Sequence, residues 1–438
     1  MTHAAAAIVS APYEDPKMIH EFALESYEAF DLLEHTCQNV FLTGRAGTGK
    51  STFLEYVRAH TEKEVVVLAP TGVAALNVRG QTIRSFFRFK PGFVDIAAIK
   101  PNCSRMFQEL ELLIIDEISM VRADVFDGID RFLRLAREND KPFGGVQICI
   151  IGDLFQLPLV VSIKEKALFA QHYPLPFFFM TKAYEAADFK MAQLNTVHRQ
   201  NDTAFVQILN AIRTGTCDIA QLEMINSRVK PQATPAPGTL VLTTTSALAQ
   251  GINNATLAKL LGKTHLYEGA LKDAFGMKEG RLPAPEQLSF KVGAQVMFVK
   301  NDSKGRWVNG TTGSVEKLCP KAVTVRIENL THEVEREQWQ TIGYEFDESQ
   351  GKIVEKTLGT YTQFPLILAW AITIHKSQGK TLELVIIDLG NSAFTTGQLY
   401  VALSRCKSLS SFVLRQPVTP ADIRCDTQVI AFMKGLAP

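Results

Sequence analysis

Short apolar runs alternate with amphipathic segments through the first 190 residues. The runs are 39–43, 64–68, 112–115 and 147–151. The last two lack polar alternation, which is typical of parallel strands covered on both faces by helices. Between them, residues 125–136 place apolar side chains at helical spacing. The pattern predicts a doubly wound α/β domain over residues 1–190, with an amphipathic helix at 17–36.

The α/β pattern continues after residue 190 and is interrupted once. Residues 264–362 carry short β-type runs separated by glycine turns, and they include Trp307 and Trp339. Strand and helix patterns resume afterwards, with an apolar strand at 384–388. We therefore expect a second α/β domain built from 191–263 plus 363–438, with a β-rich insertion at 264–362.

Composition excludes several classes of protein. The 438 residues are 46% hydrophobic and carry a net charge of +1, which excludes a disordered chain or a polycation that binds through bulk charge. The seven cysteines include no CxxC pair, so we expect neither a zinc site nor a disulfide framework. This cysteine usage is typical of a protein in the reducing cytosol. The apolar stretch at 364–374 is about half the length that spans a bilayer. We expect a cytoplasmic protein with no membrane partner.

A glycine-rich turn after the first strand fits the phosphate-binding pattern GxxxxGK[ST]. Its backbone N–H groups and the following helix N-terminus favour phosphate oxygens. Lys50 would reach the β- and γ-phosphates, and the Ser51 hydroxyl would take one Mg²⁺ position. The preceding strand and following helix argue against a chance match. The candidate nucleotide-binding residues are Gly44, Gly47, Thr48, Gly49, Lys50, Ser51 and Thr52.

Two later strands end in polar residues that complete such a site. Asp116 and Glu117 follow the strand at 112–115, at the strand ends where α/β sheets bind ligands. Asp116 would hold Mg²⁺ through water, and Glu117 would orient or deprotonate the attacking water. Gln156 follows the strand at 147–151 and has an amide that could contact both water and a γ-phosphate. Alone, each feature is often structural; together they predict nucleoside triphosphate hydrolysis with ATP and Mg²⁺.

An ordered set of motifs resembles superfamily 1B DNA helicases of the petite-integration-frequency family and its RecD- and Dda-like relatives. The matching segments are GRAGTGKS, APTGVAALNVRGQTIRSFF, LLIIDEISM, GDLFQLP, LNTVHRQ, LAWAITIHKSQGKTL and QLYVALSRCKSL, between residues 25 and 413. The resemblance implies two RecA-like domains with ATP in the cleft between them and single-stranded DNA across their top. It also implies a small 1B wedge at about 88–107 and an SH3-like 2B insertion at 264–362.

The resemblance carries roles onto particular residues. Arg199 and Arg405 would reach the γ-phosphate as arginine fingers, near Gln378 and Gly379. The positions that match DNA-facing motif residues are Thr71, Ser85, Thr373, His375 and Ser377, with the basic Lys376 adjacent. Phe86, Phe87 and Trp370 are candidates for base stacking, although buried packing is an equal alternative for them. His198, beside Arg199, fits a structural role better than a catalytic one.

Two positions depart from the family pattern. Ser26 stands where the family usually has a glutamine that contacts adenine, so triphosphates other than ATP remain open as substrates. Arg84 replaces the histidine of the family's TIHSFF motif and could add a phosphate contact.

The expected function is that of an ATP- and Mg²⁺-dependent 5′-to-3′ DNA helicase. It would load on single-stranded DNA or 5′-tailed duplex DNA, with forks, RNA–DNA hybrids or G-quadruplexes as further substrates in repair, recombination and genome maintenance. We expect it in a bacterial-type cytoplasm, with the nucleoid when on DNA. The alternatives are a translocase that displaces bound proteins with little unwinding, and an ATP-gated single-strand clamp.

Overall fold

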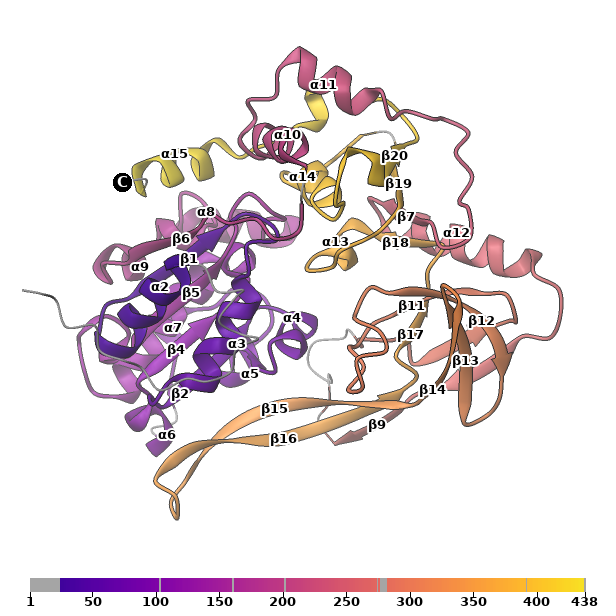
Figure 1. Cartoon of the computed structure of the whole chain (residues 1–438). Coiled ribbons are helices and arrows are strands. Elements are labelled where there is room, and N and C mark those ends of the chain that lie inside the picture. Colours follow the sequence, from indigo (N-terminus) through magenta and orange to yellow (C-terminus); the bar gives the residue numbers. More distant parts are fainter. Residues whose placement is uncertain are drawn as a thin grey trace, which may run out of the picture.

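The computed structural model describes residues 24–101, 104–159, 161–200, 202–273, 275, 282–390 and 392–436 (Figure 1). The expected helix at 17–36 is present as α2 (Leu24–His35), and residues 17–23 lie outside the described part. Two parallel sheets flanked by helices and a set of antiparallel sheets make up the fold, so the predicted α/β class is confirmed.

The first sheet contains six parallel strands in the order β3-β2-β4-β5-β1-β6. They are β1 (Val40–Gly44), β2 (Val65–Ala69), β3 (Gln81–Thr82), β4 (Leu112–Ile115), β5 (Gln147–Gly152) and β6 (Lys190–Leu194). Successive side chains alternate between two cores, as the strand period of two requires: Leu42 packs with α2 and α3, whereas Phe41 lies in the core with α7. Because both faces are covered, β4 is apolar throughout and β5 is apolar after Gln147, as their sequences predicted.

Helices and 3₁₀ turns cover both faces of the first sheet. They are α2, α3 (Lys50–His60), α4 (Gly72–Asn77), α5 (Ile83–Phe86), η1 (Ile96–Ala98), α6 (Arg105–Glu109), η2 (Ile118–Met120), α7 (Ala123–Ala136), η3 (Pro142–Gly145), α8 (Ile163–His172), η4 (Phe178–Met180) and α9 (Lys182–Ala186).

The second sheet is parallel and smaller, in the order β18-β7-β19-β20. Its strands are β7 (Leu240–Thr243), β18 (Ala371–Thr373), β19 (Val385–Asp388) and β20 (Phe412–Leu414). The associated helices are α10 (Thr203–Thr214), α11 (Ile219–Asn226), α12 (Ser246–Lys259), α13 (Ile374–Ser377), α14 (Gln398–Leu403), η5 (Leu409–Ser411), η6 (Pro420–Asp422) and α15 (Thr427–Leu436). The last of these, α15, crosses to the first domain, where Phe432 stacks on Phe179 with ring centroids 4.1 Å apart.

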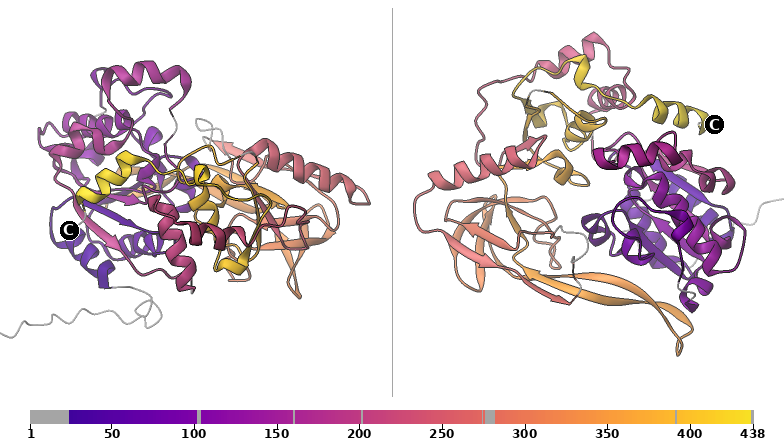
Figure 2. Two further views of the ribbon diagram at one scale, coloured as in Figure 1. Left: turned by 90° about the horizontal axis from the view of Figure 1, so that it is seen from above. Right: turned by 180° about the vertical axis from the view of Figure 1, so that it is seen from behind.

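The antiparallel sheets come after α12 in the chain, and they lie below the second sheet, on the side away from α10 and α11 (Figures 1 and 2). One has the order β14-β13-β12-β11-β17, another pairs β10 with β8, and the third has the order β15-β16-β9. Their bounds are β8 (His265–Glu268), β9 (Ala270–Asp273), β10 (Gln287–Phe290), β11 (Gln295–Phe298), β12 (Thr312–Leu318), β13 (Ala322–Ile327), β14 (Leu330–Glu335), β15 (Glu337–Asp347), β16 (Lys352–Gln363) and β17 (Leu366–Leu368).

The long β15–β16 hairpin reaches back to the first domain (Figure 1). Its Tyr344 hydroxyl accepts from the backbone N–H of Val67 and donates to the Val67 carbonyl, each at 3.3 Å. The Glu64 carboxylate accepts from the Ile353 N–H at 2.6 Å. Since β3 pairs with only the last two residues of β2, the hairpin protects backbone groups that a longer edge strand would otherwise satisfy.

Within the part of the chain that the structure describes, no helix has both the length and the apolar character that crossing a bilayer requires.

Candidate nucleotide and nucleic-acid site

The glycine-rich turn lies between β1 and α3, where the sequence motif predicts it. Gly47 and Gly49 adopt φ +83° and +87°, the left-handed region that glycine tolerates best. A Cβ on Gly47 would lie 2.7 Å from the Cβ of Arg199, so the turn also needs glycine to let the second domain approach. Thr48 is buried, and its hydroxyl donates to the Arg45 carbonyl at 3.0 Å.

Lys50 begins α3 and points back into the turn. Its Nζ donates to the carbonyls of Gly44 and Arg45 at 2.7 and 2.9 Å. Burial lowers the pKa of Lys50, whereas the nearby charges of Asp153 and Glu117 oppose that shift. The ammonium group is therefore preorganised to exchange carbonyl partners for phosphate oxygens. Ser51 and Thr52 follow in the first turn of the same helix.

Asp116 and Glu117 leave the carboxyl end of β4 and face Lys50. Burial raises the pKa of Asp116 to about 6. Burial, together with the charge of Asp116, raises the pKa of Glu117 to about 7. Glu117 adopts φ +50°, a backbone conformation that is uncommon outside glycine and is often found at functional sites. The two carboxyl groups thus lie together at the end of β4, where both residues are half-buried.

A pair of glutamines connects the two sheets across this cleft. Gln378, just after α13, donates through Nε2 to Glu117 Oε2 at 3.2 Å and to Gln156 Oε1 at 3.3 Å. Gln156 itself lies in the loop after β5 and donates to Asp153 Oδ2 at 3.3 Å. Gly379 follows Gln378 with φ +79°. The structure therefore brings Glu117, Gln156 and Gln378 into contact, although they lie far apart in the sequence.

Both candidate arginine fingers come from beyond β6 and are held mainly by neutral partners. Arg199 donates through Nε to the Thr381 hydroxyl and through Nη1 to the Ser404 carbonyl, each at 3.0 Å. Arg405 is 1% exposed and donates to the Val401 carbonyl at 3.0 Å. Burial and the charge of Arg199 lower the pKa of Arg405 to about 9. Among the described residues, no carboxylate bonds to the buried Arg405 or to the half-buried Arg199, so the two cations form a site suited to an anion.

The side chains of this cleft fit a nucleoside triphosphate with Mg²⁺. Lys50, Arg199 and Arg405 supply three positive charges, and a chain of phosphates would compensate all of them. Ser51 and Asp116 offer hydroxyl and carboxylate oxygens, the ligands that Mg²⁺ prefers when phosphates and waters complete its octahedron. Among the described residues, no group of three or more His, Cys, Asp or Glu side chains could hold a metal unaided. Ser26, which stands where the family usually has a glutamine that contacts adenine, lies on α2 and is buried.

Three threonines cap helices at the carboxyl ends of parallel strands. Thr71 precedes α4, and its Oγ1 accepts from the Ala74 N–H at 3.3 Å. Thr373 precedes α13 and accepts from the Lys376 N–H at 3.2 Å. Thr245, which no sequence motif predicts, caps α12 in the same manner, and its only sequence signal is a threonine run after an apolar strand. These caps present helix N-termini, which favour phosphate groups.

The other residues expected at DNA differ in exposure. His375 and Lys376 are exposed on α13, whereas the Ser377 hydroxyl is buried and donates to the Ile374 carbonyl at 2.7 Å. Ser85 is half-buried and accepts from Gln81 at 3.1 Å. Three aromatic candidates occupy hydrophobic cores, so the packing alternative describes them in this conformation: Phe86, Phe87 and Trp370 are 7%, 2% and 8% exposed.

Arg84 has a role that the sequence did not predict. Its guanidinium donates to the carbonyls of Lys90 and Gly92 in the segment that follows α5. Arg122 donates to the same Gly92 carbonyl at 3.1 Å and pairs with Asp124. Arg84 thus fixes the conformation of the loop at the start of the expected wedge.

The raised pKa of Glu117 predicts an unusual effect of pH on stability. An unfolded glutamate titrates near pH 4.3, below the folded value of about 7. Between these values the folded state binds more protons, so the contribution of Glu117 to the free energy of unfolding falls as pH rises through this window. Glu117→Gln should therefore melt about 2 °C or more above the unmodified protein at pH 8, with a smaller gap at pH 5.

Thermal melts without nucleotide at both pH values measure this difference. The exposed Glu62 provides the control, because Glu62→Gln should change the melting temperature little at either pH. A Glu117→Gln variant that melts below the unmodified protein at pH 8 would contradict the assigned burial.

Comparison with known proteins identifies the family. A family model described as PIF1-like helicase matches residues 24–223. The ATP-dependent DNA helicase Pif1 of Bdellovibrio bacteriovorus is 33% identical over 429 residues, covering 95% of this chain and 93% of that protein. Human ATP-dependent DNA helicase PIF1 is 33% identical over 417 residues, and the chain spans 61% of its length.

Solved structures agree with these sequence relatives. Bacteroides sp Pif1 in complex with ADP-AlF4 matches with a TM-score of 0.87 and 36% identity, over 94% of this chain and 96% of that one. Bacteroides Pif1 bound to ssDNA, with the same identity and coverage, has a TM-score of 0.68. These matches also confirm the expectation of RecA-like domains. The chain therefore belongs to the PIF1-like helicase family of ATP-dependent DNA helicases.

Proposed function

We propose that the protein hydrolyses ATP with Mg²⁺ in the cleft between its two parallel sheets and uses this reaction to move 5′ to 3′ along single-stranded DNA and to separate the duplex ahead. The observation that carries the proposal is the contact of Gln378 with both Glu117 and Gln156, because it joins the two domains at the groups suited to phosphate chemistry. The 5′-to-3′ polarity rests on the resemblance to superfamily 1B.

The reaction needs a base, a charge clamp and a means of closure. Bound Mg²⁺ would supply charge neutralisation at the phosphates, with Ser51 and Asp116 as its protein ligands. Glu117 would accept a proton from the attacking water, a role that fits a carboxyl group with a pKa of about 7. Lys50, Arg199 and Arg405 would bind the γ-phosphate oxygens, where negative charge must be stabilised during transfer.

The three threonine-capped helix ends support a binding surface for single-stranded DNA. Thr71 belongs to the first domain, whereas Thr245 and Thr373 belong to the second. A strand held at both domains would be advanced when the cleft closes and reopens. Contacts through hydroxyls and backbone N–H groups read no base sequence. Bacteroides Pif1 structures are described as bound to ssDNA and at forked dsDNA, which supports the same ligand here.

The segment at about 88–107 is the proposed wedge, of which residues 102 and 103 lie outside the described part. Arg84 and Arg122 anchor it through the Gly92 carbonyl, and Asp124 accepts from the Val94 N–H at 2.8 Å. Phe93 packs against Phe169 with centroids 5.7 Å apart. A loop held this firmly could split base pairs arriving at the first domain, which favours a helicase over a translocase that only displaces proteins.

A non-enzymatic clamp remains the contrasting function class. A clamp needs nucleotide binding but no base for water, and Glu117 with its bridging Gln378 is unnecessary for binding alone. RNA–DNA hybrids and G-quadruplexes, and roles in repair and recombination, belong to this proposal through the family resemblance.

Tailed duplexes test the proposed direction. A short duplex with a 5′ single-stranded tail should be separated in the presence of ATP and Mg²⁺, whereas the same duplex with a 3′ tail should stay paired. Loss of fluorescence quenching between the two strands measures the separation. DNA-stimulated hydrolysis without separation of either substrate would favour the translocase, and preferential opening of the 3′-tailed duplex would overturn the polarity.

Arg405→Ala should reduce the DNA-stimulated turnover of ATP on the order of 10³-fold, because an arginine finger stabilises charge that develops in the transition state. Arg415, in the same domain and paired with Asp388, offers the control: Arg415→Ala should keep near-normal turnover. If Arg405→Ala instead lowers the melting temperature and keeps normal turnover per folded molecule, the arginine is structural.

Arg84→Ala should uncouple hydrolysis from unwinding, because it releases the wedge loop and leaves the nucleotide site intact. We expect DNA-stimulated ATPase activity to persist while the unwinding rate falls several-fold. Arg134, which pairs with Asp130 on α7, is the matched control. Equal unwinding by Arg84→Ala and Arg134→Ala would show that the loop needs no such anchor.

A further inference from the structure

A buried carboxylate in the cleft takes hydrogen bonds from the opposite domain. Asp153 follows β5 in the first domain and is 1% exposed. Arg213 of α10 donates to its Oδ1 through Nη2 at 2.9 Å and Nε at 3.2 Å. Tyr400 of α14 donates to its Oδ2 at 3.1 Å. Both donors come from elements of the second domain, so the full set of contacts exists only while the two domains lie together.

Tyr400 also contacts the phosphate-binding turn. Its hydroxyl oxygen accepts from the Ala46 N–H at 3.1 Å, while its proton goes to Asp153. Arg405 follows the end of the same helix. One side chain therefore links three parts of the site: the turn, the loop after β5 and the helix that leads to the arginine finger.

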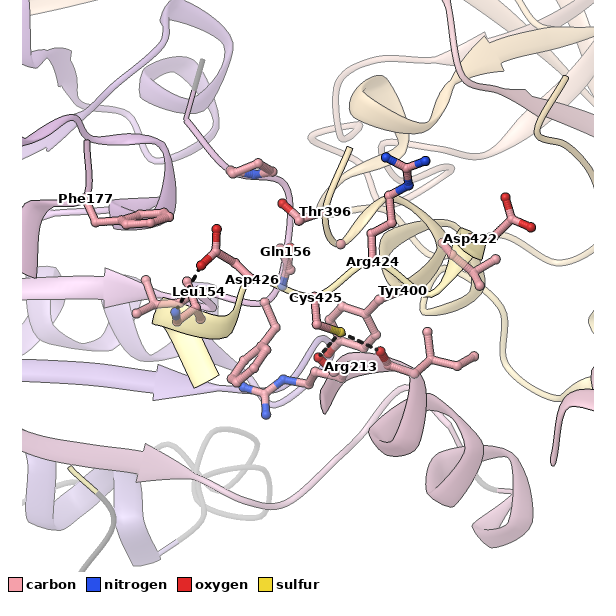
Figure 3. Close-up of a pocket in the computed structure, with 16 residues that line it drawn as sticks. Leu154, Gln156, Phe177, Arg213, Thr396, Tyr400, Asp422, Arg424, Cys425 and Asp426 are labelled. Carbon is pink, nitrogen blue, oxygen red and sulfur yellow. Dashed lines mark hydrogen bonds between the residues drawn. The ribbon is translucent and has the colours of Figure 1, made fainter. Parts of the chain in front are cut away.

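The start of α14 fits closely against the loop after β5. Gly397, with φ +70°, is the N-cap of this helix. A Cβ there would lie 2.5 Å from the carbonyl oxygens of both Phe155 and Gln156. Arg213 lies over the Phe155 ring at 4.1 Å. Shape as well as hydrogen bonding thus aligns the second domain with this loop. Figure 3 shows the cavity beside the contact, lined by Tyr400, Arg213 and Gln156 among others.

The loop in turn sets the position of the reactive groups. Asp153 accepts from Gln156 Nε2 at 3.3 Å, and Gln156 Oε1 accepts from Gln378 Nε2 at 3.3 Å. Gln378 also donates to Glu117 at 3.2 Å. An unbroken chain of hydrogen bonds therefore runs from the Ala46 N–H through Tyr400, Asp153, Gln156 and Gln378 to Glu117.

We propose that Arg213 and Tyr400 are positioning residues that hold Asp153 only in the closed cleft, so that Gln156 is aligned for hydrolysis only when the two domains have met. The proposal rests on the proposed function and adds a condition that ties turnover to closure. A buried carboxylate that has lost one partner is costly, so partly closed states are disfavoured. Closure then approaches an all-or-none event, and hydrolysis in an open or misaligned cleft is suppressed.

Tyr400→Phe tests the proposal with little change in shape. Removing the hydroxyl should lower DNA-stimulated kcat about tenfold, the effect of one hydrogen bond to a charged group, while the KM for ATP stays unchanged. Tyr361 on β16 is the matched control, since its hydroxyl is also buried and donates to the Pro285 carbonyl at 2.9 Å. Tyr361→Phe should leave kcat unaltered. Equal kcat for both variants would overturn the proposal.

A double-mutant cycle tests the contact between domains independently of folding. Arg213→Met and Asp153→Asn each break the same pair, so the double variant should lose much less kcat than the product of the two single losses. Losses that multiply would show that the two residues act separately and would overturn the proposal. Failure of the proposed function is distinguishable, because the unmodified protein would then show no DNA-stimulated turnover in the same assay.

Discussion

The partial burial of charged side chains between the two domains is the constraint on which the rest of the structure depends. Lys50, Arg199 and Arg405 lie in the cleft, and burial lowers the pKa of each. Burial raises the pKa of Asp116 and Glu117 in the same cleft. Among the described residues, none forms a salt bridge with Lys50, Arg199 or Arg405, or with either of these two carboxyl groups. A bound triphosphate with its metal would neutralise both, which gives the ligand a large effect on whether the domains close.

The fold delivers these groups from the same end of each sheet. Parallel strands place the glycine-rich turn, the two carboxyl groups and the loop of Asp153 at neighbouring strand ends. Helix α14 approaches this edge from the second domain, and the glycine at its N-cap permits the approach. The β15–β16 hairpin and α15 bridge the two domains away from the cleft, through Tyr344 and Phe432 respectively. The groups that we propose for the chemistry therefore lie where the two domains meet, so relative motion of the domains would change their geometry directly.

Sequence alone predicted the features that depend on local pattern. The glycine-rich turn and the buried strands β4 and β5 follow from short-range spacing, and the structure contains them where expected. The contacts of Asp153 with Arg213 and Tyr400 were missed because residues 60 and 247 positions apart leave no local signal. Phe86 and Trp370 could not be separated from core residues, because the burial that decides between stacking and packing arises from tertiary contacts. The sequence shows that Arg84 replaces the family's histidine, but it does not show which backbone carbonyls Arg84 contacts.

We propose that the strand regulates the nucleotide site, because DNA held at both domains would favour the closed cleft. The rate of phosphate release from ATP by the pure protein, with and without oligothymidine, tests this claim most directly. We predict that the oligonucleotide markedly accelerates phosphate release and that this acceleration is lost in Lys50→Ala. The same rate with and without the strand, at concentrations that saturate binding, would contradict it.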